Sequence, residues 1–100
     1  MAEEEFQHNR HRQRFEAWLD GELVGEATYR LSDDVAAFDH TFVEPERRQL
    51  GIAGRLVQYA FDQVRADGEW RIETLCPYVR DWASRHPEYD DLLVEPPARS

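Results

Sequence analysis

The spacing of hydrophobic residues changes near residue 50, and that change limits the folds available to this chain. Before it, apolar and polar residues alternate, as in half-buried β-strands, over residues 14–19, 23–31 and 35–43. After it, the apolar residues of 52–67 recur on one face of an α-helix. Turn sequences at Asp20-Gly21 and Ser32-Asp33-Asp34 separate the strands, so we expect an antiparallel meander followed by a helix.

The last third of the chain predicts one more strand and one more helix. Gly68 is a natural helix stop, and residues 70–75 are typical of a fourth strand. Pro77 suits the first turn of a second helix, which continues to about His86 and ends before Pro87. The order β-β-β-α-β-α predicts an α+β fold, in which a right-handed crossover places the fourth strand beside the third.

The distribution of apolar residues predicts the domain boundaries. Residues 14–94 are expected to form one domain with a modest core, which suits a chain of 100 residues. Residues 1–13 and 95–100 contain few apolar side chains and are predicted to be flexible tails. No apolar run is long enough to cross a bilayer, and a single cysteine, which cannot form an internal disulfide, fits a reducing cytoplasm.

The chain is strongly acidic, with a net charge of -9, and all 12 of its basic residues are arginine. Such a surface repels nucleic acid and anionic membranes, so neither is an expected partner, whereas cationic amines are attracted. The alternative is that the charge serves only solubility. We expect a cytoplasmic monomer or weak homodimer.

The connection between the third strand and the first helix holds the most informative residues. Gly51 and Ala53 are small enough to let backbone N–H groups approach a ligand at a helix start, where the helix dipole favours negative charge. Arg47 and Arg48 add side chains that pair with phosphates. The loop is therefore a predicted seat for a phosphate or pyrophosphate. The alternatives are an ordinary strand-to-helix connection and arginines paired with nearby surface glutamates.

Three further residues are candidates for catalysis. Cys76 lies between a strand and a helix, where a thiolate is stabilised and becomes a nucleophile or proton acceptor; a buried cysteine that only packs is the alternative. His40 is a candidate general base, and Tyr78 a candidate proton donor to a leaving thiolate, although both residue types often serve only in packing. His8 and His11 have H-x-x-H spacing but no third ligand nearby, so no metal site is predicted.

Four segments occur together in a specific order and spacing. They are His40-Thr41-Phe42-Val43-Glu44-Pro45, residues 48–53, Cys76-Pro77-Tyr78-Val79-Arg80 and Arg85-His86-Pro87-Glu88-Tyr89. Together they resemble a family of very small N-acetyltransferase-like proteins within the GNAT superfamily. The resemblance extends over residues 14–93 and implies a GNAT-like acyl-CoA N-acyltransferase fold.

The resemblance also implies a ligand and a set of site residues. Family members bind coenzyme A or acetyl-CoA, and the residue matching the cysteine considered catalytic in this family is Cys76. The pantetheine arm would lie between residues 35–43 and 70–75, hydrogen-bonded to the backbone near Phe42 and Val43. The acetyl acceptor would be an amine, on a small molecule or a protein. The pyrophosphate would lie against Arg48, Gln49, Leu50, Gly51, Ile52 and Ala53.

Two residues depart from the family pattern beside the predicted phosphate seat. Gln49 stands where the family usually has glycine, and Glu44 where it often has proline. Our leading hypothesis is an acetyl-CoA-dependent N-acetyltransferase that uses Cys76, His40 and Tyr78. The alternatives are a non-catalytic module that binds CoA or acyl-CoA, and an acidic protein-interaction domain without a cofactor.

Overall fold

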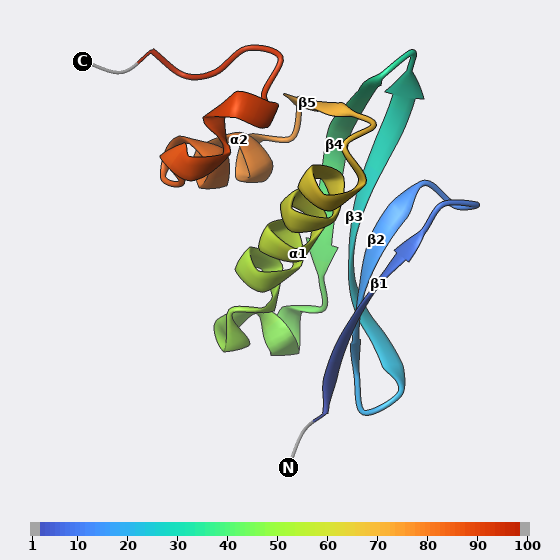
Figure 1. Cartoon of the computed structure of the whole chain (residues 1–100). Coiled ribbons are helices and arrows are strands. Elements are labelled where there is room, and N and C mark those ends of the chain that lie inside the picture. Colours follow the sequence, from blue (N-terminus) through green and yellow to red (C-terminus); the bar gives the residue numbers. More distant parts are fainter. Residues whose placement is uncertain (1–2, 99–100) are drawn as a thin grey trace.

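The computed structural model describes residues 3–98, which form one five-stranded sheet and two α-helices. The strands lie in the sheet in their order along the chain: β1 (Glu4–Asn9), β2 (Arg14–Leu19), β3 (Glu22–Ser32), β4 (Val35–Val43) and β5 (Arg71–Thr74). A 3-10 helix, η1 (Pro45–Leu50), leads into α1 (Ile52–Asp67), and β5 is followed by α2 (Pro77–Ser84) and η2 (Pro87–Leu92). Both α-helices lie on the same side of the sheet (Figure 1).

The predicted α+β fold, with its antiparallel meander and parallel last strand, is confirmed. β2, β3 and β4 pair antiparallel, and β4 pairs parallel with β5 across the α1 crossover. α1 begins and ends at the residues that the hydrophobic spacing predicts. Its buried face consists of Ile52, Leu56, Val57, Ala60, Phe61 and Val64. β5 and α2 are shorter than predicted by one or two residues at their ends.

The prediction of a flexible tail over residues 1–13 is wrong for the residues that the structure describes. Glu4–Asn9 form β1, which pairs antiparallel with β2 along its length. Phe6 stacks on Tyr59 of α1 with ring centroids 5.5 Å apart, and His8 stacks on Phe15 of β2 at 4.0 Å. Residues 95–98 lie outside helices and strands and 99–100 lie outside the described residues, so the flexible C-terminal end stays a prediction.

β4 contains one extra residue that reverses the alternation of its side chains. Its register with β3 passes from Tyr29↔Phe38 to Thr28↔His40, so Asp39 is the extra residue of a β-bulge. Before the bulge, the even-numbered Phe38 is buried; beyond it, the even-numbered His40 and Phe42 are exposed, while the odd-numbered Thr41 is half-buried and Val43 is buried. The bulge therefore decides which side chains at the end of β4 face the helices.

β4 and β5 are paired over only part of their length. Parallel pairing runs from Val35↔Arg71 to Phe38↔Thr74, while β4 continues to Val43. The Phe38 carbonyl accepts hydrogen bonds from the N–H groups of both Leu75, at 3.0 Å, and Cys76, at 2.8 Å. At that point the chain turns away into α2. β4 and the chain leaving β5 therefore diverge from the Phe38 carbonyl.

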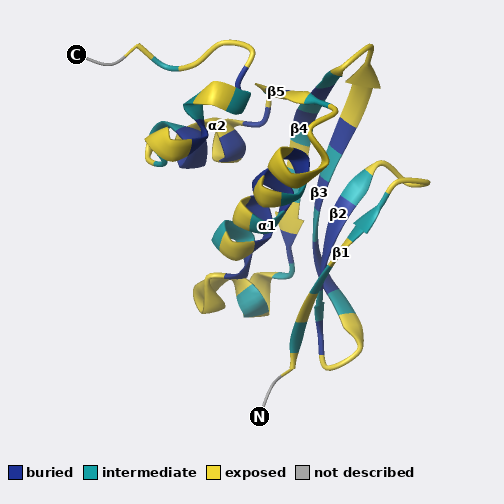
Figure 2. Cartoon of the chain, in the orientation of Figure 1, coloured by how far each residue is buried: buried dark blue, intermediate teal, exposed yellow. Residues whose placement is uncertain are grey.

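The hydrophobic core lies between the sheet and the helices (Figure 2). Phe15 of β2, Phe38 of β4 and Phe61 of α1 are fully buried, and their rings meet in series at 5.8 and 5.7 Å. Trp82 of α2 extends this row, with its ring 5.2 Å from that of Phe61. α1 and α2 are thus fixed to the sheet through one aromatic row. Neither they nor any other helix within residues 3–98 is long and apolar enough to span a membrane.

The opposite face of the sheet carries a buried carboxylate. Glu16 is 3% exposed and accepts hydrogen bonds from Arg14 Nε at 2.7 Å, Asn9 Nδ2 at 3.0 Å and Trp18 Nε1 at 3.1 Å. Burial alone would raise its pKa, but the three donors and the Arg14 charge outweigh burial, so the pKa of Glu16 lies below its ordinary value. Glu16 is therefore a carboxylate at neutral pH, and through Asn9 it ties β1 to β2.

His8 makes the stability of the fold depend on pH. Its Nε2 lies 2.7 Å from Tyr29 Oη, and its ring is stacked on Phe15. Burial, and then the charge of Arg10, lower the pKa of His8 from its ordinary value of 6.5, although Asp67 opposes the change. Below that ordinary value, the unfolded chain binds the proton more readily than the folded protein.

We expect the free energy of unfolding to decrease as the pH falls from about 7.5 to about 5.5, and to decrease less in His8→Gln. The sign follows because protonation of the imidazole favours the unfolded chain within this range. Urea unfolding of both proteins at several pH values measures the effect. Equal losses of stability in the two proteins would contradict the assignment to His8.

Candidate functional site

The chain leaves β4 through η1 and enters α1 at Gly51. Gly51 has φ 76° and ψ 16°, in the left-handed region that favours glycine. Its N–H donates to Arg48 O and its C=O accepts from Arg55 N, both at 3.3 Å. No side chain within residues 3–98 caps the start of α1. The first turn therefore presents N–H groups without helical partners, at Ile52, Ala53 and Gly54.

A cavity of about 290 Å³ lies beside this helix start. The end of β4, the loop, the first turn of α1 and the start of α2 supply its lining: Thr41, Val43, Arg48, Gly51, Ala53, Gly54 and Tyr78. A Cβ on Gly54 would be in ordinary van der Waals contact with Tyr78 Oη, at 3.7 Å, and a Cβ on Gly51 would stand 3.0 Å from Arg55 Nη1. Of the residues predicted from the sequence, the structure thus brings together Val43, Arg48, Gly51, Ala53 and Tyr78.

The other predicted binding residues lie around the cavity and do not line it. Gln49 and Leu50 are exposed at the end of η1, and Ile52 is buried in the core. Phe42 is exposed, and its side chain alternates with Val43, so it lies on the sheet face away from the helices. For Phe42 the predicted contact is through the backbone, which strand alternation does not affect.

The two loop arginines have different surroundings. Arg48 Nε donates to Val43 O at 3.0 Å, which fixes this side chain at the cavity wall and occupies a carbonyl predicted to meet the pantetheine arm. Arg47 turns toward β3, where its Nη2 lies 3.3 Å from Glu22 Oε1. Burial, a hydrogen bond with Glu46 and neighbouring carboxylates raise the pKa of Glu44. Of the two loop arginines, Arg48 is therefore the one that lines the cavity.

Arg55 is a further cation at this site that the sequence analysis missed. It lies in the first turn of α1, with Nη1 against Gly51. Its Nε and Nη2 donate to the two carboxylate oxygens of Glu4 at 2.8 and 2.7 Å. Its position four residues after Gly51 was the available signal, because residues at that spacing lie one above the other on a helix. The uncapped N–H groups and Arg48 thus lie at the cavity, and Arg55 lies beside Gly51, one of the residues that line it.

Cys76 lies where β4 and β5 diverge. It precedes Pro77 at the start of α2, is 7% exposed, and has Sγ 3.6 Å from Thr41 Oγ1. Thr41 also lines the cavity, so the thiol lies one side chain behind its wall. Tyr78 presents its hydroxyl to the cavity itself. Burial, the largest cause, raises the pKa of Tyr78, which keeps this hydroxyl protonated at neutral pH.

The structure does not bring His40 to Cys76. The side chain of Thr41 reaches the thiol, and successive side chains of a strand point to opposite faces of the sheet. His40 is exposed and lies beyond the Asp39 bulge, on the face away from both helices. Without the bulge the alternation would place it on the helix face, so the sequence pattern was no guide here.

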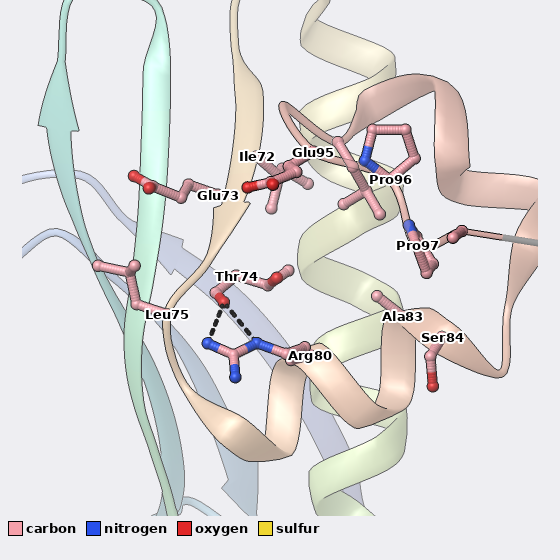
Figure 3. Close-up of a pocket in the computed structure, with 12 residues that line it drawn as sticks. Ile72, Glu73, Thr74, Leu75, Arg80, Ala83, Ser84, Glu95, Pro96 and Pro97 are labelled. Carbon is pink, nitrogen blue, oxygen red and sulfur yellow. Dashed lines mark hydrogen bonds between the residues drawn. The ribbon is translucent and has the colours of Figure 1, made fainter.

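A second and larger cavity, of about 420 Å³, separates β5 and α2 from the C-terminal segment (Figure 3). Arg80 lines this cavity, but its guanidinium is already hydrogen-bonded: Nε and Nη2 both donate to Thr74 O at 3.3 Å. Glu73 and Glu95 also line it. None of the predicted site residues lines this cavity, so size alone does not make it the candidate site.

The fold resembles solved acetyltransferase structures. A GCN5-like protein from Staphylococcus aureus, solved by NMR, has a TM-score of 0.68 and 21% identity, over 90% of this chain and 87% of that one. An aminoglycoside acetyltransferase from an uncultured soil metagenomic sample has a TM-score of 0.58 and 17% identity. The ribosomal-protein-alanine N-acetyltransferase from Brucella melitensis biovar Abortus 2308 has a TM-score of 0.55 and 21% identity.

The last two matches include 87% of this chain but only 62% and 64% of the larger proteins. At these identities the comparison establishes a shared fold. A search of curated proteins found no match. The family described as GCN5-related N-acetyl-transferase matches residues 14–92, which include every element from β2 to η2. The chain therefore belongs to the GCN5-related N-acetyltransferase family.

Proposed function

We propose that the protein binds acetyl-CoA at the start of α1 and transfers the acetyl group to an amine. The observation that carries this proposal is a cavity at the uncapped start of α1, which Arg48, Gly51, Ala53 and Gly54 line and beside which Arg55 lies against Gly51. Backbone donors, a helix dipole and arginines all favour a diphosphate. Gly51 and Gly54 leave the space that close approach of such a group requires.

The divergence of β4 from the chain leaving β5 supports a binding site there for the pantetheine arm and the thioester of the ligand. Beyond the Phe38 carbonyl, β4 continues to Val43 without β5 beside it, and that stretch leads from Cys76 toward the α1 start. Acetyl-CoA supplies an activated thioester, which this arrangement would deliver near Cys76 and Tyr78. Tyr78, protonated at neutral pH, would donate a proton to the departing thiolate.

Two routes of acetyl transfer fit these residues. In the first, the neutral amine attacks the thioester carbonyl directly, the bond between the acetyl carbon and the CoA sulfur breaks, the departing thiolate takes a proton from Tyr78, and the proton that the amine loses passes to water. In the second, Cys76 Sγ loses its proton and forms a bond to the acetyl carbon while the bond to the CoA sulfur breaks; the amine then displaces Sγ. The acidic surface suits an amine acceptor, which is a cation in water.

A CoA titration followed by amide NMR tests the binding site. The largest shift changes are expected at residues 50–54, whereas residues 93–98 at the second cavity serve as the internal control. If the changes cluster at 72–75 and 93–98 instead, the ligand binds the larger cavity and the proposal fails. If no amide shifts, a cofactor-free interaction domain becomes the better account.

Mass spectrometry after incubation with acetyl-CoA tests the chemistry. An acetyl group mapped to Cys76, absent in Cys76→Ala, supports the covalent route; turnover of an amine without it supports direct transfer. The burial of Cys76 and the distant His40 favour one other account, a module that binds CoA without catalysis. Tight binding with neither adduct nor turnover would establish that account.

A further inference from the structure

β1 reaches the ligand site through one ion pair. Its Glu4 holds Arg55 by two hydrogen bonds, of 2.8 and 2.7 Å, and β1 is the outermost strand of the sheet (Figure 1). β1 also lies outside residues 14–92, which match the family. This chain thus has a contact to the proposed diphosphate seat that comes from outside its family domain.

Arg55 lies between the Glu4 carboxylate and the proposed diphosphate seat. Its Nε and Nη2 face Glu4, while its Nη1 lies where a Cβ on Gly51 would stand 3.0 Å away. Glu4 occupies the Nε/Nη2 edge, so a diphosphate at the α1 start would gain that edge of the guanidinium only by displacing the carboxylate. Guanidinium groups bind phosphates best through two parallel N–H donors, as they do carboxylates. Arg55 offers that edge to one anion at a time.

We propose that Glu4 competes with the diphosphate of the ligand for Arg55, so that docking of β1 weakens ligand binding. The inference rests on the proposed function, because it requires a diphosphate at the α1 start. The same competition works in reverse: by linkage, ligand binding loosens the Glu4 end of β1 by an equal free energy. The other end stays attached, because Arg10 pairs with Asp67 and Glu69.

The size of the effect follows from the exposure of the pair. The side chains of Arg55 and Glu4 are 47% and 26% exposed, so solvent screens their attraction. Partly exposed pairs contribute up to about 1 kcal/mol, which is roughly a fivefold change in affinity. The competition is thus large enough to measure and too small to prevent binding.

Calorimetric titration with CoA of the wild type and four variants tests the proposal. Glu4→Gln is expected to bind CoA about threefold to fivefold more tightly than wild type. Glu5→Gln is the matched control, because Glu5 is the next residue of β1, is exposed, and points to the other face; its affinity should equal that of wild type. Arg55→Gln is expected to weaken binding about tenfold, and in Arg55→Gln the Glu4→Gln change should have little effect.

Hydrogen exchange supplies a readout that a structural role of Glu4 would not produce. Saturating CoA should speed exchange of the amides at the Glu4 end of β1 and leave the Arg10 end unchanged. Weaker binding by Glu4→Gln would overturn the proposal, since Glu4 would then orient Arg55 for the ligand. Equal changes of CoA affinity in Glu4→Gln and Glu5→Gln would contradict the proposal, because the loss of one negative charge anywhere on β1 would then explain the effect. If wild type does not bind CoA at residues 50–54, the proposed function fails together with this inference; if it does and Glu4→Gln matches wild type, only this inference fails.

Discussion

Gly51→Val is expected to weaken CoA binding by about 100-fold, because it removes the close approach of the ligand to the α1 start. The Gly51 backbone has φ 76°, and a Cβ there would stand 3.0 Å from Arg55 Nη1. A β-branched residue is strained at positive φ, so we also expect a stability loss of about 1–2 kcal/mol. Calorimetric CoA titration and urea unfolding measure the two effects separately.

Gly68 provides the control for backbone strain. It has φ 68° at the other end of α1, and a Cβ there would meet no atom of the described residues within 4 Å. Gly68→Val should therefore lose similar stability and keep its affinity for CoA. If Gly51→Val also keeps its affinity, the diphosphate does not bind at this helix start. If Gly68→Val loses affinity as well, strain rather than the site explains the loss.

Glu16→Ala is expected to have the largest effect on stability, a loss of about 3–5 kcal/mol. The substitution removes a 3% exposed carboxylate and leaves three donors, on Arg14, Asn9 and Trp18, without their acceptor. Part of the loss arises in β1, which Asn9 attaches to Glu16. Urea unfolding monitored by tryptophan fluorescence measures the change.

Glu26→Ala is the matched control for this substitution. Glu26 lies directly opposite Glu16 on β3 and pairs with the same Arg14, but at 3.5 Å and with 28% of its side chain exposed. It should cost at most about 1 kcal/mol. Similar losses in both variants would show that burial of Glu16 contributes no additional stability.

The lowered pKa of Glu16 also determines how acid changes the free energy of unfolding. The folded protein favours the ionised carboxylate more than the unfolded chain does, so the stabilising contribution of Glu16 is complete above the ordinary pKa of 4.5. That contribution is lost as the pH falls through the lower folded value. Glu16→Ala should accordingly show a weaker decrease of stability in acid than wild type.

The meander and α1 were predictable because their signals are local. Alternation over residues 35–43, the turn at Asp20-Gly21 and the helical spacing of 52–67 each depend on neighbours in the sequence. β1 was missed because its packing partners, Tyr59 and Phe15, lie on other elements, and its own sequence is rich in glutamate, a weak strand former.

The site was predictable to the same extent. Gly51 and Ala53 are small residues at a helix start, a pattern that predicts close approach of a ligand to the backbone. The loop could therefore be recognised from the sequence as a candidate binding site. The place of His40 could not, because it depends on the extra residue Asp39, which only the register between β3 and β4 reveals. The Glu4–Arg55 pair joins residues 51 apart in sequence, a distance at which no local pattern operates.

The shared hydrogen bonds to the Phe38 carbonyl have a consequence for how this chain tolerates change in length. β4 and the chain that leaves β5 diverge at that oxygen. From there, five residues of β4 lead to Val43, a span of roughly 16 Å at the usual rise of a strand. Inserting or deleting one residue in this stretch of β4 would change its length by about 3.3 Å. It would also turn the side chains of Thr41 and Val43 to the opposite face of the sheet. Homologous chains that keep the chemistry should thus scarcely vary in the length of this stretch of β4.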